Sequence, residues 1–412
     1  MVKRLWMAMM LAHICASTGL AAGPAISVTA KQRYPWNGLV DVDFTVAGDS
    51  GSKYKVAFSA KDEGGGTNLT MKTVRKSDGT AANMAGEQLA PGTYRWVWNA
   101  AADLPKDFVC NRVTVEGKAE VYDPLYMVID LSGGASATSY PVSYLDAVPS
   151  GGWSDTYKTT KLVLRRIEAG TFTMGSPSGE SGRCNDEVQH EVTLTKPFFI
   201  GVFEVTQKQY ALITGKTPCN STSYGKGDTY PVHYISYNDL RGSTQGAKWP
   251  SSSNVDSSSF SGILRTKTGL QGIDLPTEAQ WEYACRSGTT GTYAGTDSIA
   301  TMGWYNGNAG GKAHPVGGKA ANQWGLYDMH GNVQEWTRDW FNSRVTNEAV
   351  IDPAPDNSHA EGCRVRRGGS WYDNANCCRS ADRQHNSVAD AWNSFPNHTT
   401  KALGFRISLI IQ

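Results

Sequence analysis

The chain has 412 residues, which is enough for two or three domains, and its 39 Lys and Arg against 38 Asp and Glu give a formal net charge of +1. This balance argues against nucleic acid and anionic membrane surfaces as partners, and a hydrophobic content of 40% excludes a disordered chain. The 44 glycines, 13 tryptophans and 18 tyrosines favour a loop-rich fold in which aromatic rings anchor long turns.

Residues 1–23 have the layout of a secretory signal peptide. Lys3 and Arg4 form a basic head, residues 5–16 are apolar except for one histidine, and small residues lead to a cleavage site near Ala22. The apolar run is too short to span a bilayer comfortably, and no later stretch approaches about 20 apolar residues. We therefore expect a secreted or periplasmic protein without a transmembrane segment after cleavage. A retained N-terminal anchor is the alternative.

Residues 24–121 are expected to form a small all-β sandwich of the immunoglobulin or fibronectin kind. Apolar and polar side chains alternate along residues 40–46 and again along residues 94–98, which is the period of a strand with one buried face. Turn signals at residues 64–66 and 91–92 separate such stretches. No catalytic cluster is visible in this region, which favours a structural or spacer role.

Residues 122–161 are expected to be a linker, because Gly, Ala and Ser dominate residues 130–139 and a second turn-rich stretch occupies residues 149–152. Residues 162–412 are expected to form an α+β domain with short strands and three capped helices. The capping signals are Thr206 with Gln209, Ser236 alone, and Thr277 with Gln280. In the helix after Thr277, three side chains fall on one face: Trp281, Ala284 and Cys285.

Six ordered motifs in residues 162–412 resemble the formylglycine-generating enzyme (sulfatase-modifying factor) family. They are residues 170–176, 204–206, 275–286, 322–336, 367–371 and 404–406. The resemblance implies a C-type-lectin-like fold with little regular secondary structure. It leaves the function open, because the family includes copper-dependent oxidases that convert a sulfatase cysteine to formylglycine, sulfoxide synthases, and pure binding proteins. The helical iron domain of the sulfoxide synthases, with its His-x3-His-x-Glu arrangement, has no counterpart in this sequence.

The oxidases of this family carry a C-x4-C cysteine pair shortly after a Gly-Gly-Ser that matches residues 368–370. Counted without gaps, the first cysteine position holds Asp373 and the second holds Cys378. Aligned instead on residues 379–381, neither cysteine matches. The adjacent Cys377 and Cys378 are weak catalytic candidates, because neighbouring side chains of an extended segment point to opposite faces. We therefore expect no copper site and no oxidase activity.

Seven cysteines remain once Cys15 leaves with the signal peptide, and an exported protein can form disulfides. The odd number leaves at least one thiol outside any intramolecular pair. Cys377 or Cys378 is expected to be half of a structural disulfide, with Cys285 as a candidate partner. The other pairings cannot be read from sequence, and no Cys or His spacing indicates a zinc site.

The resemblance also implies a calcium site at residues 328–336. Carried over position by position, the ligands are the Asp328 side chain, the carbonyl oxygens of Gly331 and Val333, and the Glu335 carboxylate. Calcium prefers several hard oxygen ligands, and a glycine-containing turn can direct carbonyls between two carboxylates. The alternative is a turn whose carboxylates accept hydrogen bonds from backbone amides, with His330 as a turn residue.

Two functions compete for this sequence: an exported enzyme with altered or lost chemistry, and a non-catalytic ligand-binding or display protein. The missing cysteine pair and the β-rich spacer favour the second. The polar loop between residues 371 and 404 is then the expected ligand surface, for a protein or carbohydrate of unknown identity, although it is equally typical of an ordinary solvated loop. Its candidate residues are Trp371, Asn374, Asn376, Arg383, His385 and Trp392.

Overall fold

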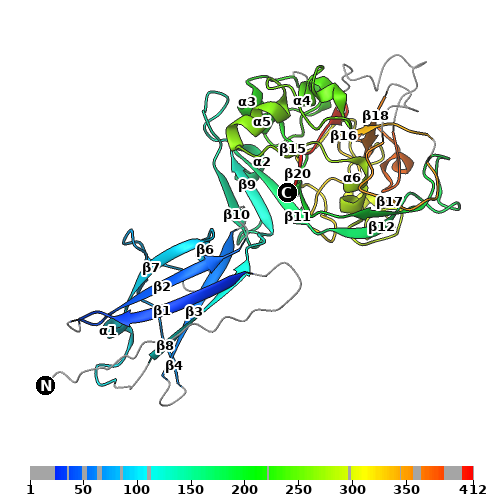
Figure 1. The fold of residues 1–412 in the computed structure, drawn as a ribbon. Coiled ribbons are helices and arrows are strands. Elements are labelled where there is room, and N and C mark those ends of the chain that lie inside the picture. Colours follow the sequence, from blue (N-terminus) through cyan, green and yellow to red (C-terminus); the bar gives the residue numbers. More distant parts are fainter. Residues whose placement is uncertain are drawn as a thin grey trace. The chain divides into compact units, whose positions relative to one another are not determined.

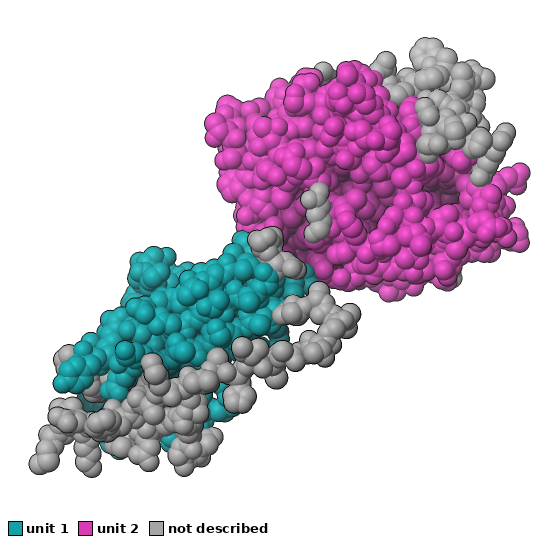
Figure 2. All heavy atoms as spheres, viewed as in Figure 1, with its two compact units in different colours: residues 1–123 teal, residues 124–412 magenta. Residues whose placement is uncertain are grey.

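The computed structural model describes residues 24–34, 37–48, 53–62, 67–83, 87–108, 113–219, 222–295, 298–343, 345–355, 363–384 and 401–411. The predicted signal peptide, Cys110, His385 and Trp392 lie outside these ranges. The chain forms two compact units, residues 1–123 and residues 124–412 (Figure 2). Among the residues described, no helix has both the length and the apolar character needed to cross a membrane.

The described residues of the first unit form two antiparallel sheets and one short helix, α1 (Ala100–Asp103) (Figure 1). One sheet has the order β1 (Ala25–Gln32), β2 (Leu39–Ala47), β7 (Gly92–Asn99) and β5 (Val74–Arg75). In the other sheet β3 (Tyr54–Asp62) pairs with β4 (Asn68–Leu69), β6 (Glu87–Leu89) and β8 (Val113–Val121).

A single apolar core joins the two sheets of the first unit. Alternate residues of β2, including Val42 and Phe44, are buried, and they pack with Trp96 and Trp98 of β7. Val56 of β3 reaches the same cluster from the other sheet. The alternation predicted along residues 40–46 and 94–98 is thus the inward face of a two-layer arrangement.

The second unit is a mixture of short helices and short strands. Its largest sheet has the order β10 (Val142–Leu145), β9 (Tyr126–Asp130), β11 (Lys161–Ile167), β14 (Phe198–Gly201), β20 (Ser408–Ile410) and β15 (Ile273–Asp274). A three-stranded sheet contains β12 (Gly170–Met174), β13 (His190–Leu194) and β17 (Val350–Ile351). Another contains β18 (Arg364–Arg367), β16 (Gln334–Trp340) and β19 (Leu403–Gly404).

The expected linker at residues 122–161 is wrong, because most of it belongs to the second unit. β9 pairs along its length with both β10 and β11, and α2 (Thr156–Thr159) precedes β11. Met127 and Ile129 of β9 are buried in the main core of this unit. The Gly, Ala and Ser residues that suggested a flexible connector form only the loop between β9 and β10.

The three predicted helix starts are confirmed in the structure. Capping boxes begin α3 (Gln207–Thr214) and α6 (Glu278–Arg286) at Thr206 and Thr277, and Ser236 caps α4 (Tyr237–Arg241). The predicted inward face of α6 is buried, including Trp281 and Cys285. In the described part of the second unit, three helices were not predicted: α2, α5 (Phe260–Thr268), which Ser259 caps at the end of a Ser-rich stretch, and α7 (Ile299–Met302).

Candidate functional site

The segment that follows β18 occupies the position of the family's cysteine pair. It turns sharply at Gly368 and Gly369, which both have positive φ angles, and continues into a short 3-10 helix, Ala375–Cys378. A Cβ atom on Gly369 would collide with the carbonyl oxygen of Cys377 and the sulfur of Cys378. The second glycine of the Gly-Gly-Ser motif therefore allows the chain to fold back closely on itself.

Asp373 lies in this turn and is held by two hydrogen bonds. Its Oδ2 atom accepts one from the Ser370 hydroxyl at 2.6 Å and another from Gln334 Nε2 at 3.0 Å. Its backbone carbonyl accepts a third bond from Asn306 at 2.9 Å. At the first position of the expected C-x4-C pair, the structure thus has a fixed carboxylate.

The surroundings of the two thiols in this segment disfavour the thiolate form. Burial, followed by the negative charges of Asp373 and Asp382, raises the pKa of Cys378 well above its usual value. The same causes raise the pKa of the half-buried Cys377 to about 11. Copper(I) coordination and thiol exchange both require thiolates. The residues present therefore do not fit a two-thiolate copper site.

The predicted disulfide between Cys285 and Cys377 or Cys378 is not formed. The buried imidazole of His330 contacts Cys285 and Cys378: its Nε2 atom lies 3.7 Å from Cys285 Sγ, and its Nδ1 atom donates to the Cys378 carbonyl at 2.8 Å. His330 Nε2 also accepts a bond from the Ala294 amide at 3.0 Å. His330 is thus a buried connector of three segments rather than a simple turn residue.

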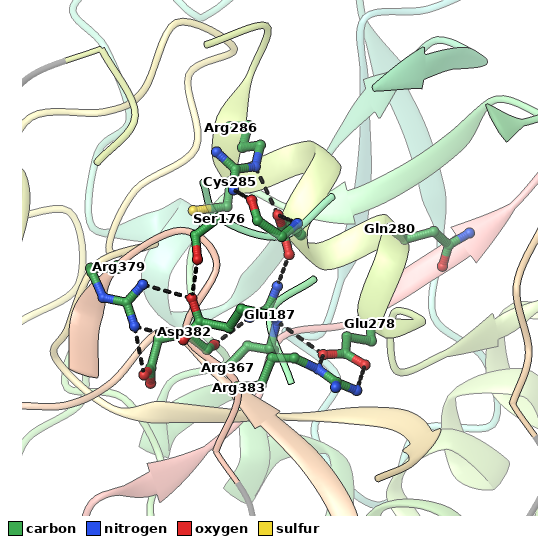
Figure 3. A network of polar contacts seen from close by, with 12 residues as sticks. Ser176, Glu187, Glu278, Gln280, Cys285, Arg286, Arg367, Arg379, Asp382 and Arg383 are labelled. Atoms are coloured by element: carbon green, nitrogen blue, oxygen red, sulfur yellow. Dashed lines mark hydrogen bonds and ion pairs between the residues drawn. The ribbon is translucent and has the colours of Figure 1, made fainter. Parts of the chain in front are cut away.

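A network of ion pairs fixes the chain on both sides of this turn (Figure 3). Arg379 bonds both oxygens of Glu187 at 2.7 Å, and Arg383 bonds both oxygens of Glu278 at 2.6 and 2.8 Å. Arg286 and Arg367 share the Glu282 carboxylate. These pairs join the segment at residues 367–383 to α6 and to the loop before β13.

The six predicted ligand-surface residues do not form one exposed surface. Trp371 is a core residue with 2% exposure, and the Arg383 side chain is buried against Glu278, so neither prediction is supported. Asn374 and Asn376 are exposed, and the Asn374 side chain caps the 3-10 helix by accepting from the Asn376 amide. His385 and Trp392 lie outside the described residues.

The exposed aromatic residue at this site is Tyr372, which the sequence analysis did not single out. Its side chain is 60% exposed, and the Lys401 ammonium lies 4.2 Å from the centre of its ring. The same ammonium lies 5.5 Å from the Trp371 ring, which stacks on Tyr224 at a centroid distance of 5.8 Å. We call Tyr372 and Lys401 the Tyr372–Lys401 surface. Trp371 is buried, so Tyr372 is the aromatic residue of this turn that faces solvent.

The predicted calcium turn brings its two carboxylates into one buried environment. Asp328 has a φ angle of 57°, and its Oδ2 atom accepts a hydrogen bond from the Gly317 amide at 2.6 Å, whereas its Oδ1 atom has no partner. Both oxygens of Glu335 are occupied by Arg406, at 2.7 and 2.7 Å, and one also accepts from Trp281 Nε1 at 2.8 Å. Asp328 is thus the predicted ligand with a free oxygen.

Glu204 is a third carboxylate at this turn. It belongs to one of the family motifs, but only the structure shows that it accepts hydrogen bonds from Asn332 Nδ2 at 2.7 Å and from the Val333 amide at 3.0 Å. Burial and the charges of Asp328 and Glu335 raise the pKa of Glu204 well above its usual value. Burial is also the main cause that raises the pKa of Asp328 to about 6.

Three carboxylates therefore share the single buried guanidinium of Arg406, with a weaker contribution from Lys158 to Asp328. Unpaired buried carboxylates are costly, so this excess of negative charge favours a bound cation or a bound proton. In the described part of the chain, no group of three or more His, Cys, Asp or Glu side chains is arranged to hold a metal ion. A calcium ion here would consequently need the backbone carbonyls of Gly331 and Val333 as well.

Sequence comparisons with known proteins match the second unit. The family described as the sulfatase-modifying factor enzyme 1-like domain matches residues 154–408. The chaperone protein LppX of Paenibacillus barcinonensis is 30% identical over 271 residues, which are 57% of this chain and 86% of LppX. The formylglycine-generating enzyme of Streptomyces coelicolor is 28% identical over 58% of this chain and 87% of the enzyme. The solved structure of PvdO from Pseudomonas aeruginosa is 27% identical, with a TM-score of 0.49, over 60% of this chain and 94% of PvdO.

Proposed function

Because this chain belongs to the family of sulfatase-modifying factor enzyme 1-like domains, we propose that its second unit is a non-catalytic, ligand-binding member with a C-type-lectin-like fold. We propose further that residues 1–23 direct a bacterial protein to the periplasm or the cell exterior. The relatives carry different names, an enzyme in one case and a chaperone in another, so membership alone does not assign an activity.

The observation that carries the proposal is the fixed carboxylate of Asp373 at the first position of the family's cysteine pair. An oxidase of this family needs two soft thiolates for copper(I) and for exchange with the substrate cysteine. Asp373 supplies a hard oxygen ligand instead, and its negative charge raises the pKa of Cys378. Both effects oppose the chemistry that the resemblance implied.

The decisive experiment is a copper-supplied assay on a sulfatase-motif peptide, read as mass loss at the peptide cysteine. We expect no conversion by this protein, whereas the Streptomyces coelicolor enzyme provides the positive control. Asp373→Cys restores the C-x4-C spacing with Cys378, and we expect copper(I) binding to rise in that variant alone. Conversion by the unaltered protein, abolished by Cys378→Ser, would show that it is an enzyme.

The Tyr372–Lys401 surface is the proposed ligand contact. An exposed aromatic ring offers an apolar face on which a sugar ring or an apolar side chain can stack, and the adjacent ammonium adds a hydrogen-bond donor. A glycan array provides the direct test for carbohydrate. We expect any specific signal to be lost in Tyr372→Ala and kept in Tyr34→Ala, a matched variant of another exposed tyrosine that lies in the first unit.

We also propose calcium as a structural cofactor at the buried carboxylates. Asp328 has an unpartnered oxygen for it, and Glu204 lies close enough for the two carboxylates to raise one another's energy. Calcium would supply the positive charge that Arg406 alone does not. The test compares the pH dependence of stability with and without calcium.

A further inference from the structure

A second candidate site lies in the second unit, and its lining includes no residue of the Asp373 turn or the calcium turn. It is a cavity of about 660 Å³ between the start of α6, the end of β16, the loop before β13 and the segment around β17. Apolar side chains form much of its wall, including Met174, Val188, Ala279 and Val350. A cavity of this volume suits a small organic ligand or a single large side chain.

Three of the carboxylates that line the cavity already have cationic partners. Glu187 is paired with Arg379 and Glu278 with Arg383, as the close view shows (Figure 3). Glu282 is paired with both Arg286 and Arg367. These groups are structural, because each joins two segments of the unit and leaves no net charge for a ligand.

Asp186 and Asp339 each retain an oxygen without a hydrogen-bond partner, and Asp339 is the fully buried one. It is 1% exposed, and its Oδ2 atom accepts a hydrogen bond from the Glu278 amide at the first residue of α6. Its Oδ1 atom has no hydrogen-bond partner. Arg338 and Arg364 act on it through their charge, yet burial and the charge of Glu278 still raise its pKa to about 7.

Three further carboxylates lie at the edge of the cavity and extend its negative charge outward. Asp186 is 3.7 Å from Arg383, and Asp352 accepts hydrogen bonds from the amide and hydroxyl of Thr195. Glu348 is exposed. The positively charged or titratable bases in the lining are Arg383, which is paired with Glu278, and His190. Carboxylate groups therefore predominate at the edge of the cavity.

We propose that this cavity binds an organic cation, an alkyl-guanidinium or alkyl-ammonium group whose charged end bonds to Asp339 and whose chain lies along the apolar wall. A guanidinium or ammonium group donates hydrogen bonds and carries a positive charge. It would therefore supply the hydrogen-bond donor that the Oδ1 atom of Asp339 lacks. An apolar wall stabilises the methylene groups of such a ligand, as it does those of buried Lys and Arg side chains. A metal ion fits less well, because it requires several oxygens converging on one point, and the described side chains form no such group.

The cation can come from a free amine or from a basic side chain of a peptide, and the experiment distinguishes these sources. Calorimetric titration of the full protein with agmatine, with spermidine and with the blocked peptide acetyl-Gly-Arg-Gly-amide is compared with titration of pentanamide, a neutral control. We expect saturable binding of at least one cation and none of pentanamide. Binding confined to the peptide identifies a side chain as the ligand group, and binding confined to the amines identifies a free amine.

Two variants assign the binding to this cavity. Asp339→Asn keeps the shape of the side chain and removes its charge, so we expect affinity to fall by about tenfold or more, the effect of one charge-assisted hydrogen bond. Glu348→Gln changes an exposed charge at the edge, so we expect a loss of about threefold or less. Glu168→Gln, which removes an exposed carboxylate outside the cavity lining, is the matched control and should leave the affinity unchanged.

Val188→Phe provides an independent arm if Asp339→Asn does not fold. It narrows the cavity without changing any charge, and we expect it to weaken cation binding. Absence of saturable cation binding to the unaltered protein would overturn the proposal. Equal binding of pentanamide, or unchanged affinity in both Asp339→Asn and Val188→Phe, would also overturn it.

Discussion

The cores of the two units differ in what they bury. In the described part of the first unit, the buried side chains are all apolar or aromatic, whereas the second unit buries eight arginines together with many of their carboxylate partners. Apolar cores are non-directional and tolerate changes of geometry, but each buried charge requires a particular partner. The first unit is therefore stabilised by the apolar faces of its strands, and the second also depends on specific ion pairs between segments that are distant in sequence.

Removal of one buried charge should give the largest effect. Arg406→Met leaves Glu335 without the guanidinium that bonds both its oxygens and leaves Glu204 and Asp328 without their nearest cation. Loss of one partner from a buried ion pair typically costs about 3–5 kcal/mol. Denaturant unfolding, followed by hydrogen exchange to assign the change, should show this loss in residues 124–412 alone. An equal loss of stability in both units would contradict the conclusion that buried ion pairs stabilise the second unit specifically.

The charge excess at the calcium turn should give an intermediate effect that depends on pH. The folded-state pKa of Asp328 is raised to about 6, so the folded protein keeps a proton that the unfolded chain releases near pH 4. Stability therefore falls as the pH rises from about 4 to about 6, by about 2–3 kcal/mol in total for this group, of which about 1.4 kcal/mol is lost between pH 5 and pH 7.5.

Melting temperatures at pH 5 and pH 7.5 test this prediction, once in chelator and once in millimolar calcium. In chelator we expect a lower melting temperature at pH 7.5. With calcium the difference should shrink or reverse, because the cation binds ionised carboxylates and stabilises the folded state by about 2.7 kcal/mol at a hundredfold excess over Kd. The same pH dependence in both solutions would contradict the calcium assignment.

An ion pair on the first unit should give the smallest effect. Arg33 bonds Asp41 at 2.7 Å, but the two side chains are 38% and 21% exposed. Arg33→Met is the counterpart of Arg406→Met, and we expect it to cost less than about 1 kcal/mol because solvent screens the pair. The same denaturant experiment measures it. A loss as large as that of Arg406→Met would show that burial is not what separates the two units.

Local signals in the sequence predicted many of the elements. The capping boxes at Thr206 and Thr277 act within four residues, and the structure confirms both. The linker prediction failed because it depends on a long-range interaction. β9 pairs with β11, whose first residue lies about thirty positions further along the chain, and no hairpin turn between the two strands indicates this pairing. Short apolar strands without a hairpin turn are difficult to recognise from one sequence.

The candidate sites divide in the same way. The sequence alone was enough to place Asp373 at a cysteine position, because this assignment depends only on the spacing from the Gly-Gly-Ser motif. The sequence could not place Glu204 beside Asp328, because these residues belong to segments more than a hundred positions apart. Nor could it show that Arg383 is buried against Glu278 rather than exposed for a ligand.

By itself, then, the sequence determined the family of the second unit, its helix caps and the inward face of the sandwich strands. Each depends on spacing along the chain, through local hydrogen bonds or through the two-residue and 3.6-residue periods of the backbone. Only the tertiary structure decided which charges share a buried site: the carboxylates around Arg406 and the unpaired oxygen of Asp339. The pKa of a buried group depends on how deeply it is desolvated and on which charges lie near it in space, and neither quantity follows from residue order.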